Sequence, residues 1–185
     1  DHILFLLSLL LPAVLVWQAR AWRPAPTFRE SFWDVVRIVT AFTVAHSITL
    51  TLATLGFATL PSRWVESAIA ASVVLAALNN VRPFVQGRRW AVAFGFGLIH
   101  GFGFASVLAD LGLTRATLAL ALVGFNLGVE LGQLAIVVLF LPLAFALRRT
   151  VLYRRWVMLG GSLLIALLAG VWFVERMFDL KLLSA

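Results

Sequence analysis

The 185-residue chain is 62% hydrophobic and only 12% charged, which is far more apolar than a soluble globular domain of this size. Its formal net charge of +7 comes mainly from arginines grouped between apolar runs. Arginines in such positions indicate how a chain is oriented in the membrane and do not indicate nucleic-acid binding. Cysteine is absent, which excludes disulfides, thiolate catalysis and cysteine-ligated zinc or iron–sulfur sites.

The chain begins at Asp1 and runs directly into an apolar stretch, without the basic region or the small-residue cleavage site of a signal peptide. We therefore expect it to be a processed or trimmed piece of a longer protein.

Six apolar runs are long enough to cross about 30 Å of hydrocarbon at a helical rise of about 1.5 Å per residue. They cover roughly residues 2–18, 32–56, 62–80, 90–109, 116–146 and 156–177. The breaks between them carry proline, asparagine and arginine, and none is long enough for a soluble domain. The sequence therefore predicts an all-α, polytopic membrane protein, a bundle of six transmembrane helices that forms one domain over residues 1–185.

Positive charge is distributed unevenly over the connections between these helices. Eleven of the fifteen Lys and Arg residues lie at alternate connections or at the helix ends beside them: Arg20, Arg23, Arg29, Arg37, Arg82, Arg88, Arg89, Arg148, Arg149, Arg154 and Arg155. The other four lie in the opposite loops and the C-terminal tail: Arg63, Arg115, Arg176 and Lys181. By the positive-inside rule the arginine-rich side is cytoplasmic, so both termini are predicted to be extracytoplasmic.

A weak internal repeat aligns the second and fourth predicted helices on Phe42-x-x-x-His46 and Phe96-x-x-x-His100. Both copies run in the same direction, so an axis along the membrane normal would relate them. Chance similarity between apolar helices is the competing explanation.

All three histidines lie within predicted spans, where ionisable groups are costly and mark functional sites. His2 follows Asp1 at the outer end of the first span, and His46 and His100 lie near mid-depth in the second and fourth. A carboxylate and imidazoles offer oxygen and nitrogen ligands to a divalent transition metal. The alternative is a polar helix start for Asp1 and His2, and neutral hydrogen-bonded histidines elsewhere. The matching depth of His46 and His100 weakens that alternative.

The fifth predicted helix carries a polar stripe of Asn126, Glu130 and Gln133 at positions i, i+4 and i+7. Glycines spaced by four occupy the other side of the helix: Gly124, Gly128 and Gly132. This pattern favours close packing on the glycine face and presentation of a carboxylate and two amides on the other. The mid-depth histidines, His46 and His100, are the simplest candidate partners for the Glu130 carboxylate.

Three further polar residues are candidates for a pathway or a supporting role: Ser47, Glu66 and Asn80. Glu66 follows a helix start, where a negative charge also suits the helix dipole. Asn80 could line an exit, although asparagine before Val81-Arg82-Pro83 is also a common helix end.

Four motifs together resemble those of the HupE/UreJ family over nearly the whole chain: Asp1-His2-Ile3-Leu4-Phe5, Phe42-Thr-Val-Ala-His46-Ser47-Ile-Thr-Leu, Phe96-Gly-Leu-Ile-His100-Gly101 and Phe125-Asn126-Leu-Gly-Val-Glu130-Leu-Gly-Gln133. Members of that family are multi-pass proteins of the bacterial inner membrane, described as hydrogenase or urease accessory proteins and considered nickel or cobalt permeases. The resemblance implies uptake of a metal ion, and an extracytoplasmic domain or partner ahead of the membrane part. It also implies metal ligands at these positions: Asp1, His2, His46, His100, Asn126 and Glu130.

The leading hypothesis is a permease for a divalent transition metal, nickel or cobalt before zinc, and not an enzyme. In it His2 captures the ion outside, and the midplane residues His46, His100 and Glu130 bind it, with Asn126 and Gln133 completing the site. No nucleotide-binding loop is present, so energy would come from the membrane potential, proton exchange or a separate protein. The alternatives are an intramembrane zinc hydrolase and a non-transporting accessory or assembly protein.

Overall fold

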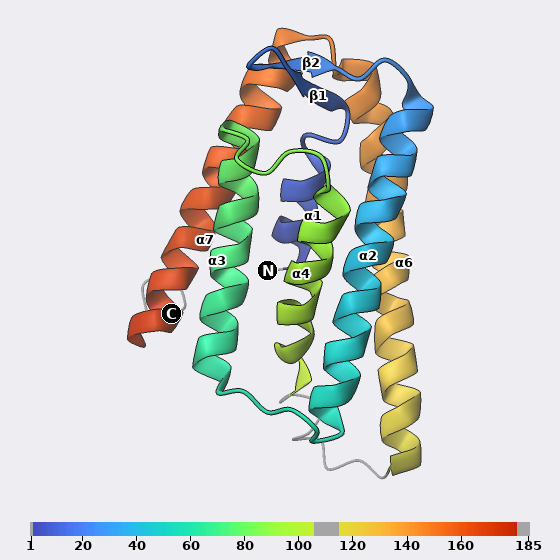
Figure 1. The fold of residues 1–185 in the computed structure, drawn as a ribbon, viewed down its shortest axis with the longest axis vertical. Coiled ribbons are helices and arrows are strands. Elements are labelled where there is room, and N and C mark those ends of the chain that lie inside the picture. Colours follow the sequence, from blue (N-terminus) through green and yellow to red (C-terminus); the bar gives the residue numbers. More distant parts are fainter. Residues whose placement is uncertain (1, 106–114, 181–185) are drawn as a thin grey trace.

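A computed structural model of the chain describes residues 2–105 and 115–180. In this part the chain forms α-helices, one π-helical segment and a β-hairpin (Figure 1). In chain order these elements are α1 (His2–Leu10), β1 (Leu15–Gln18), β2 (Ala21–Pro24), α2 (Phe28–Thr54), α3 (Ser62–Val81), α4 (Arg89–Phe102), α6 (Arg115–Leu147), η1 (Leu152–Gly160) and α7 (Gly161–Phe178). The chain is therefore mainly helical, as the sequence predicts.

Four helical segments of the described residues are long and apolar enough to cross a membrane: Phe28–Thr54, Ser62–Val81, Thr117–Leu147 and Leu152–Phe178. They correspond to the second, third, fifth and sixth predicted spans. The fourth predicted span contains α4, which has 14 residues, and its last four positions, 106–109, lie outside the described residues.

The first predicted span, residues 2–18, is wrong. α1 has nine residues, about 13 Å of helix, which is too short to cross a bilayer. Pro12 lacks a backbone donor and cannot continue the helix, and the chain then forms the antiparallel hairpin of β1 and β2. The hairpin turn holds Ala19 and Arg20 at φ of 49° and 60°, the left-handed values that a two-residue turn of this kind requires.

α1 lies inside the bundle, with the longer helices around it, and the hairpin closes one end (Figure 1). We call this the hairpin end. α2, α4 and α7 run away from it, whereas α3 and α6 run towards it. α2 and α4 are therefore parallel, as the internal repeat predicts. The arginine-rich connections, which are the hairpin, the start of α2, the α3–α4 loop and the α6–η1 loop, all lie at the hairpin end.

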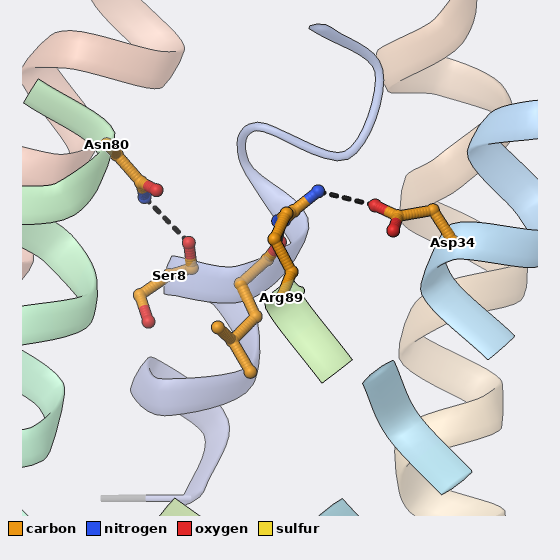
Figure 2. A network of polar contacts seen from close by, with 5 residues as sticks. Ser8, Asp34, Asn80 and Arg89 are labelled. Atoms are coloured by element: carbon orange, nitrogen blue, oxygen red, sulfur yellow. Dashed lines mark hydrogen bonds and ion pairs between the residues drawn. The ribbon is translucent and has the colours of Figure 1, made fainter. Parts of the chain in front are cut away.

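The last carbonyl groups of α1 face the interior, where a helix end needs hydrogen-bond partners. Side chains from three other elements donate to carbonyls at this end of α1. These bonds run from Asn80 Nδ2 to the Ser8 oxygen (2.6 Å), from Arg89 Nη2 to the Leu9 oxygen (2.6 Å) and from the Tyr153 hydroxyl to the Leu11 oxygen (2.8 Å). The end of α1 is thus fixed to α3, α4 and η1, and Figure 2 shows the Asn80 contact.

Asn80, a candidate pathway residue from the sequence, is buried and connects four segments. Its side-chain nitrogen donates to the Ser8 carbonyl and to Ser162 Oγ (3.1 Å). Its backbone carbonyl accepts a hydrogen bond from Trp22 Nε1 at 2.8 Å. These contacts hold the hairpin, α1, α3 and α7 together.

Asn80→Leu keeps a similar side-chain volume but removes the donor for the Ser8 carbonyl. We expect the free energy of unfolding to fall by about 1–3 kcal/mol, because a buried acceptor loses its partner. The measurement is thermal unfolding in detergent. Leu78→Ala, at an exposed position of the same helix, serves as the control, and equal melting temperatures for the two variants would contradict the assigned role.

Candidate functional site

The three histidines of the chain meet inside the bundle. His2 lies between the other two, with its ring centroid 5.3 Å from that of His46 and 5.0 Å from that of His100. The rings of each pair are nearly perpendicular, at 83° and 80°. His46 and His100 are completely buried. We call these three residues the histidine cluster.

The predicted position of His2 at an outer mouth is wrong. α1 begins near mid-height of the bundle (Figure 1), because the short helix is attached to the hairpin end and reaches only part of the way through. His2 therefore lies at the depth of His46 and His100. Asp1 lies outside the described residues.

Two glycines of α4 bring His46 and His100 to the same depth. A Cβ added at Gly97 would lie 2.5 Å from the Phe42 carbonyl oxygen, and one at Gly101 would collide with the His46 carbonyl. Any larger residue would force α4 away from α2. The contact depends on these small residues, as close helix pairs in membranes commonly do.

Several ring nitrogens of the histidine cluster are buried without a hydrogen-bond partner among the described residues. They are His2 Nε2, both ring nitrogens of His46, and His100 Nδ1. Buried polar atoms are nearly always paired, so a group of unpaired nitrogens at one place indicates a ligand site.

Ser72 of α3 fixes the tautomer of His100. Its hydroxyl donates to the Ile69 carbonyl at 2.6 Å and lies 2.9 Å from His100 Nε2. Because the serine proton is already used, Nε2–H of His100 donates to the serine oxygen. The lone pair then resides on Nδ1, the unpaired nitrogen, and neutral imidazole oriented in this way is the form that binds metals.

Phenylalanine rings surround the histidine cluster. Ring-centroid distances are 4.6 Å from Phe5 to His100, 5.3 Å from Phe42 to His100, 5.1 Å from Phe104 to His2 and 6.2 Å from Phe125 to His46. The rings provide an apolar wall, so the imidazole nitrogens are the groups here that can replace water around an ion.

Within the described residues, no group of three His, Cys, Asp or Glu side chains is arranged to hold a metal ion. The separations of the His2 ring from the other two, 5.3 and 5.0 Å, are nevertheless close to those of metal-bound imidazoles. Three imidazoles bound tetrahedrally to one ion at about 2.0–2.1 Å have ring centroids about 5 Å apart.

The amides of α6 hold this helix against α2. Ser47 Oγ donates to Asn126 Oδ1 at 2.9 Å, and Thr43 Oγ1 donates to Gln133 Oε1 at 3.1 Å. Asn126 Nδ2 donates to the Leu122 carbonyl of its own helix at 3.0 Å. The structure therefore brings Ser47 and Asn126 together next to His46, and Gln133 further along the same helix contact.

The structure does not bring Glu130 to the histidine cluster. Glu130 is exposed on α6 and forms no hydrogen bond or ion pair with another described residue. The predicted packing of the glycine face is also wrong for the described chain. A Cβ added at Gly124, Gly128 or Gly132 would meet nothing within 4 Å.

Glu66 lies at the start of α3, opposite the hairpin end, and not beside the histidines. Its carboxylate is 3.5 Å from Arg176 Nε. It lines a cavity of about 190 Å³ together with Phe102, Gly103 and Ala105, the residues that follow His100 along the chain. The cavity therefore lies at the end of the bundle opposite the hairpin, beyond the last turn of α4.

A family profile described as "HupE / UreJ protein" matches residues 1–176. The chain belongs to the HupE/UreJ family. No curated protein and no solved structure matches the chain. The family consists of membrane proteins with a nickel- or cobalt-related accessory or permease role, in agreement with the membrane-spanning helices.

Sequence reasoning missed three residues around the site of this HupE/UreJ protein: Ser72, Asp34 and Arg89. Ser72 is one of many small residues in α3, and no sequence signal distinguishes it. Asp34, by contrast, is an ionisable residue inside a predicted span, and the rule that selected the histidines also selects it. Arg89, counted only as a topology charge, forms an ion pair with Asp34 at 2.5 Å.

Gly101→Ala tests the helix contact that aligns the histidines. We expect it to lower the free energy of unfolding by about 1–3 kcal/mol through overpacking, and to weaken binding of Co²⁺, measured by titration of the purified protein. Gly128→Ala is the matched control. Its Cβ enters open space, so we expect no loss of stability, because alanine favours a helix by about 1 kcal/mol over glycine. Equal behaviour of the two variants would refute the role of Gly101.

Proposed function

We propose that this protein transports a divalent transition-metal ion, nickel or cobalt, across the bacterial inner membrane through the histidine cluster. One observation carries the proposal: His2, His46 and His100 meet in the bundle with unpaired ring nitrogens. Imidazole suits nickel, cobalt and zinc and does not suit magnesium or calcium. Family membership favours nickel and cobalt among these ions.

Cavities on both sides of the histidine cluster support transport rather than permanent storage. On one side lies the cavity lined by Glu66. On the other side, a cavity of about 80 Å³ is lined by Phe96 and Arg89, and Arg89 also lines a larger cavity of about 290 Å³ beneath the hairpin. Phe96 contacts Phe5, which in turn lies against His100. Two aromatic rings in contact, those of Phe96 and Phe5, thus connect the wall of the smaller cavity to His100.

The arginine-rich hairpin end faces the cytoplasm in this proposal, by the positive-inside rule. The ion then enters near Glu66, binds the histidines and leaves beneath the hairpin. Both ends of the route carry carboxylates, at Glu66 and at Asp34, which attract a cation to each opening.

His46→Ala and His100→Ala test the transport proposal. We expect each to reduce uptake of radioactive nickel or cobalt into cells or proteoliposomes by at least about tenfold, because even residues that only orient metal ligands contribute about 10–100-fold. Glu130→Gln is the control. The sequence predicts Glu130 as a ligand, but the structure leaves it exposed on α6 and away from the histidine cluster, so we expect normal uptake. Normal uptake in both histidine variants would refute the proposal, whereas binding of metal without uptake by the wild type would indicate an accessory protein.

Ser72→Ala tests the assignment of the His100 tautomer. Without the serine oxygen the proton is free to move to Nδ1, so we expect metal affinity to fall by about tenfold while the protein stays folded. Ser67→Ala is the matched control, since Ser67 is a buried serine of the same helix whose hydroxyl bonds to the Arg63 carbonyl. Titration with Co²⁺ measures both, and an equal affinity would contradict the assignment.

A further inference from the structure

The cavity of about 290 Å³ beneath the hairpin is lined in part by polar side chains. One face of the first two turns of α2 contributes three side chains with oxygen atoms: Glu30, Ser31 and Asp34. Asp34 follows Glu30 by four residues and Ser31 by three, spacings that make side chains neighbours on a helix surface, so Asp34 lies beside both of the others on this wall of the cavity. Arg89 of α4 lies on the same cavity.

Ser31 is the unusual member of this wall. The residue is 2% exposed, and its hydroxyl oxygen is buried without a hydrogen-bond partner among the described residues. A helical serine commonly donates to a carbonyl of the preceding turn, as Ser67 does at 2.7 Å. Ser31 lines the cavity, and its buried hydroxyl lacks the polar partner that such groups nearly always have, which a ligand in the cavity would supply.

Asp34 supplies the charge. Its carboxylate is 39% exposed and accepts a hydrogen bond from Arg89 Nη1 through Oδ2 at 2.5 Å, as Figure 2 shows. Arg89 also donates to the Leu9 carbonyl at the end of α1. The Arg89 guanidinium is thus held beside the Asp34 carboxylate and provides its positive partner.

The remaining amides of the wall serve the α3–α4 loop. Asn79 Oδ1 accepts from the backbone N–H groups of Phe84 and Val85 at 3.0 and 2.8 Å. Gln86 Nε2 donates to the Pro83 carbonyl at 3.5 Å. Asn79 Oδ1 is thus occupied within the loop, whereas the side-chain oxygens of α2 are not used by it.

We propose that Ser31, Asp34 and Glu30 form a second cation site, which receives the divalent ion after it leaves the histidine cluster. This inference rests on the proposed transport function. Carboxylate and hydroxyl oxygens bind nickel and cobalt more weakly than imidazole does, so the second site favours release. Arg89 neutralises Asp34 when no ion is present and competes with an arriving ion for the carboxylate.

An oxygen-only site has a chemistry that distinguishes it from the histidine cluster. Carboxylate and hydroxyl ligands accept Mn²⁺, which imidazole sites hold weakly compared with nickel or cobalt. Titration of the purified, full-length protein in detergent with Mn²⁺ alone, followed by electron paramagnetic resonance, therefore reports on the second site.

Asp34→Asn and Arg89→Gln are expected to change Mn²⁺ affinity in opposite directions. Asp34→Asn removes the charged ligand and should lower affinity by at least about tenfold, whereas Arg89→Gln removes the competing cation and should raise it by about tenfold. Asp179→Asn, an exposed carboxylate at the end of α7, is the control and should leave affinity unchanged. A purely structural ion pair predicts lower melting temperatures for both variants and an unchanged Mn²⁺ affinity, and that result overturns the inference.

Two further variants keep the test decisive if Asp34→Asn does not fold. Ser31→Ala and Glu30→Gln should each lower Mn²⁺ affinity by about threefold, since each removes one ligand without affecting the Arg89 contacts. Unchanged affinity in both overturns the inference. His46→Ala should retain Mn²⁺ binding. If the second site is wrong, the substitutions in α2 leave Mn²⁺ affinity unchanged. If the transport proposal is wrong, the histidine substitutions leave metal uptake unchanged.

Discussion

A helix that ends inside an apolar bundle must have its last carbonyl groups satisfied, and this constraint organises the protein. The end of α1 receives donors from Asn80, Arg89 and Tyr153. Each donor belongs to a different element, so α3, α4 and η1 are held at fixed positions around α1. Unpaired groups in hydrocarbon cost several kcal/mol each. The short helix and its donors therefore depend on one another.

The other end of α1 supplies the chemistry. Because the helix stops at its ninth residue, His2 meets His46 and His100 in the interior. Two different kinds of contact complete the cluster: the close approach of α2 and α4 at Gly97 and Gly101, and the hydrogen bond from His100 to Ser72. The first sets the spacing of the rings, and the second sets which nitrogen is free.

Much of this arrangement could be predicted from the sequence. The long apolar runs, the asymmetry of the arginines and the cost of buried histidines fix the four long spans and select His46 and His100. The family resemblance is confirmed by the matching profile. Residues 3–17, however, are apolar apart from Ser8, and hydropathy does not distinguish one long helix from a short helix followed by a hairpin. Pro12 was the one local signal for the break.

The orientation of α6 shows a second limit. Glu130 lies only about 40° around the helix from Asn126, yet Asn126 faces α2 and Glu130 is exposed. Periodicity gives the angles between residues but not the direction in which the whole face points, which depends on the neighbouring helices. Two members of the predicted polar stripe, Asn126 and Gln133, therefore contact α2, whereas the third, Glu130, does not.

The hairpin and α1 together determine the depth of the histidine cluster in the bundle. Its strands pair Trp17 with Trp22 and carry Arg23, and its turn carries Arg20, residue types that favour the headgroup layer of a bilayer. α1 extends inward from this layer by about 13 Å, close to half of a hydrocarbon core of about 30 Å. The number of residues between the hairpin and His2 therefore determines how far the histidine cluster lies from this layer. In a bilayer of that thickness, with the hairpin at the headgroup layer, the cluster would lie near the centre of the hydrocarbon core.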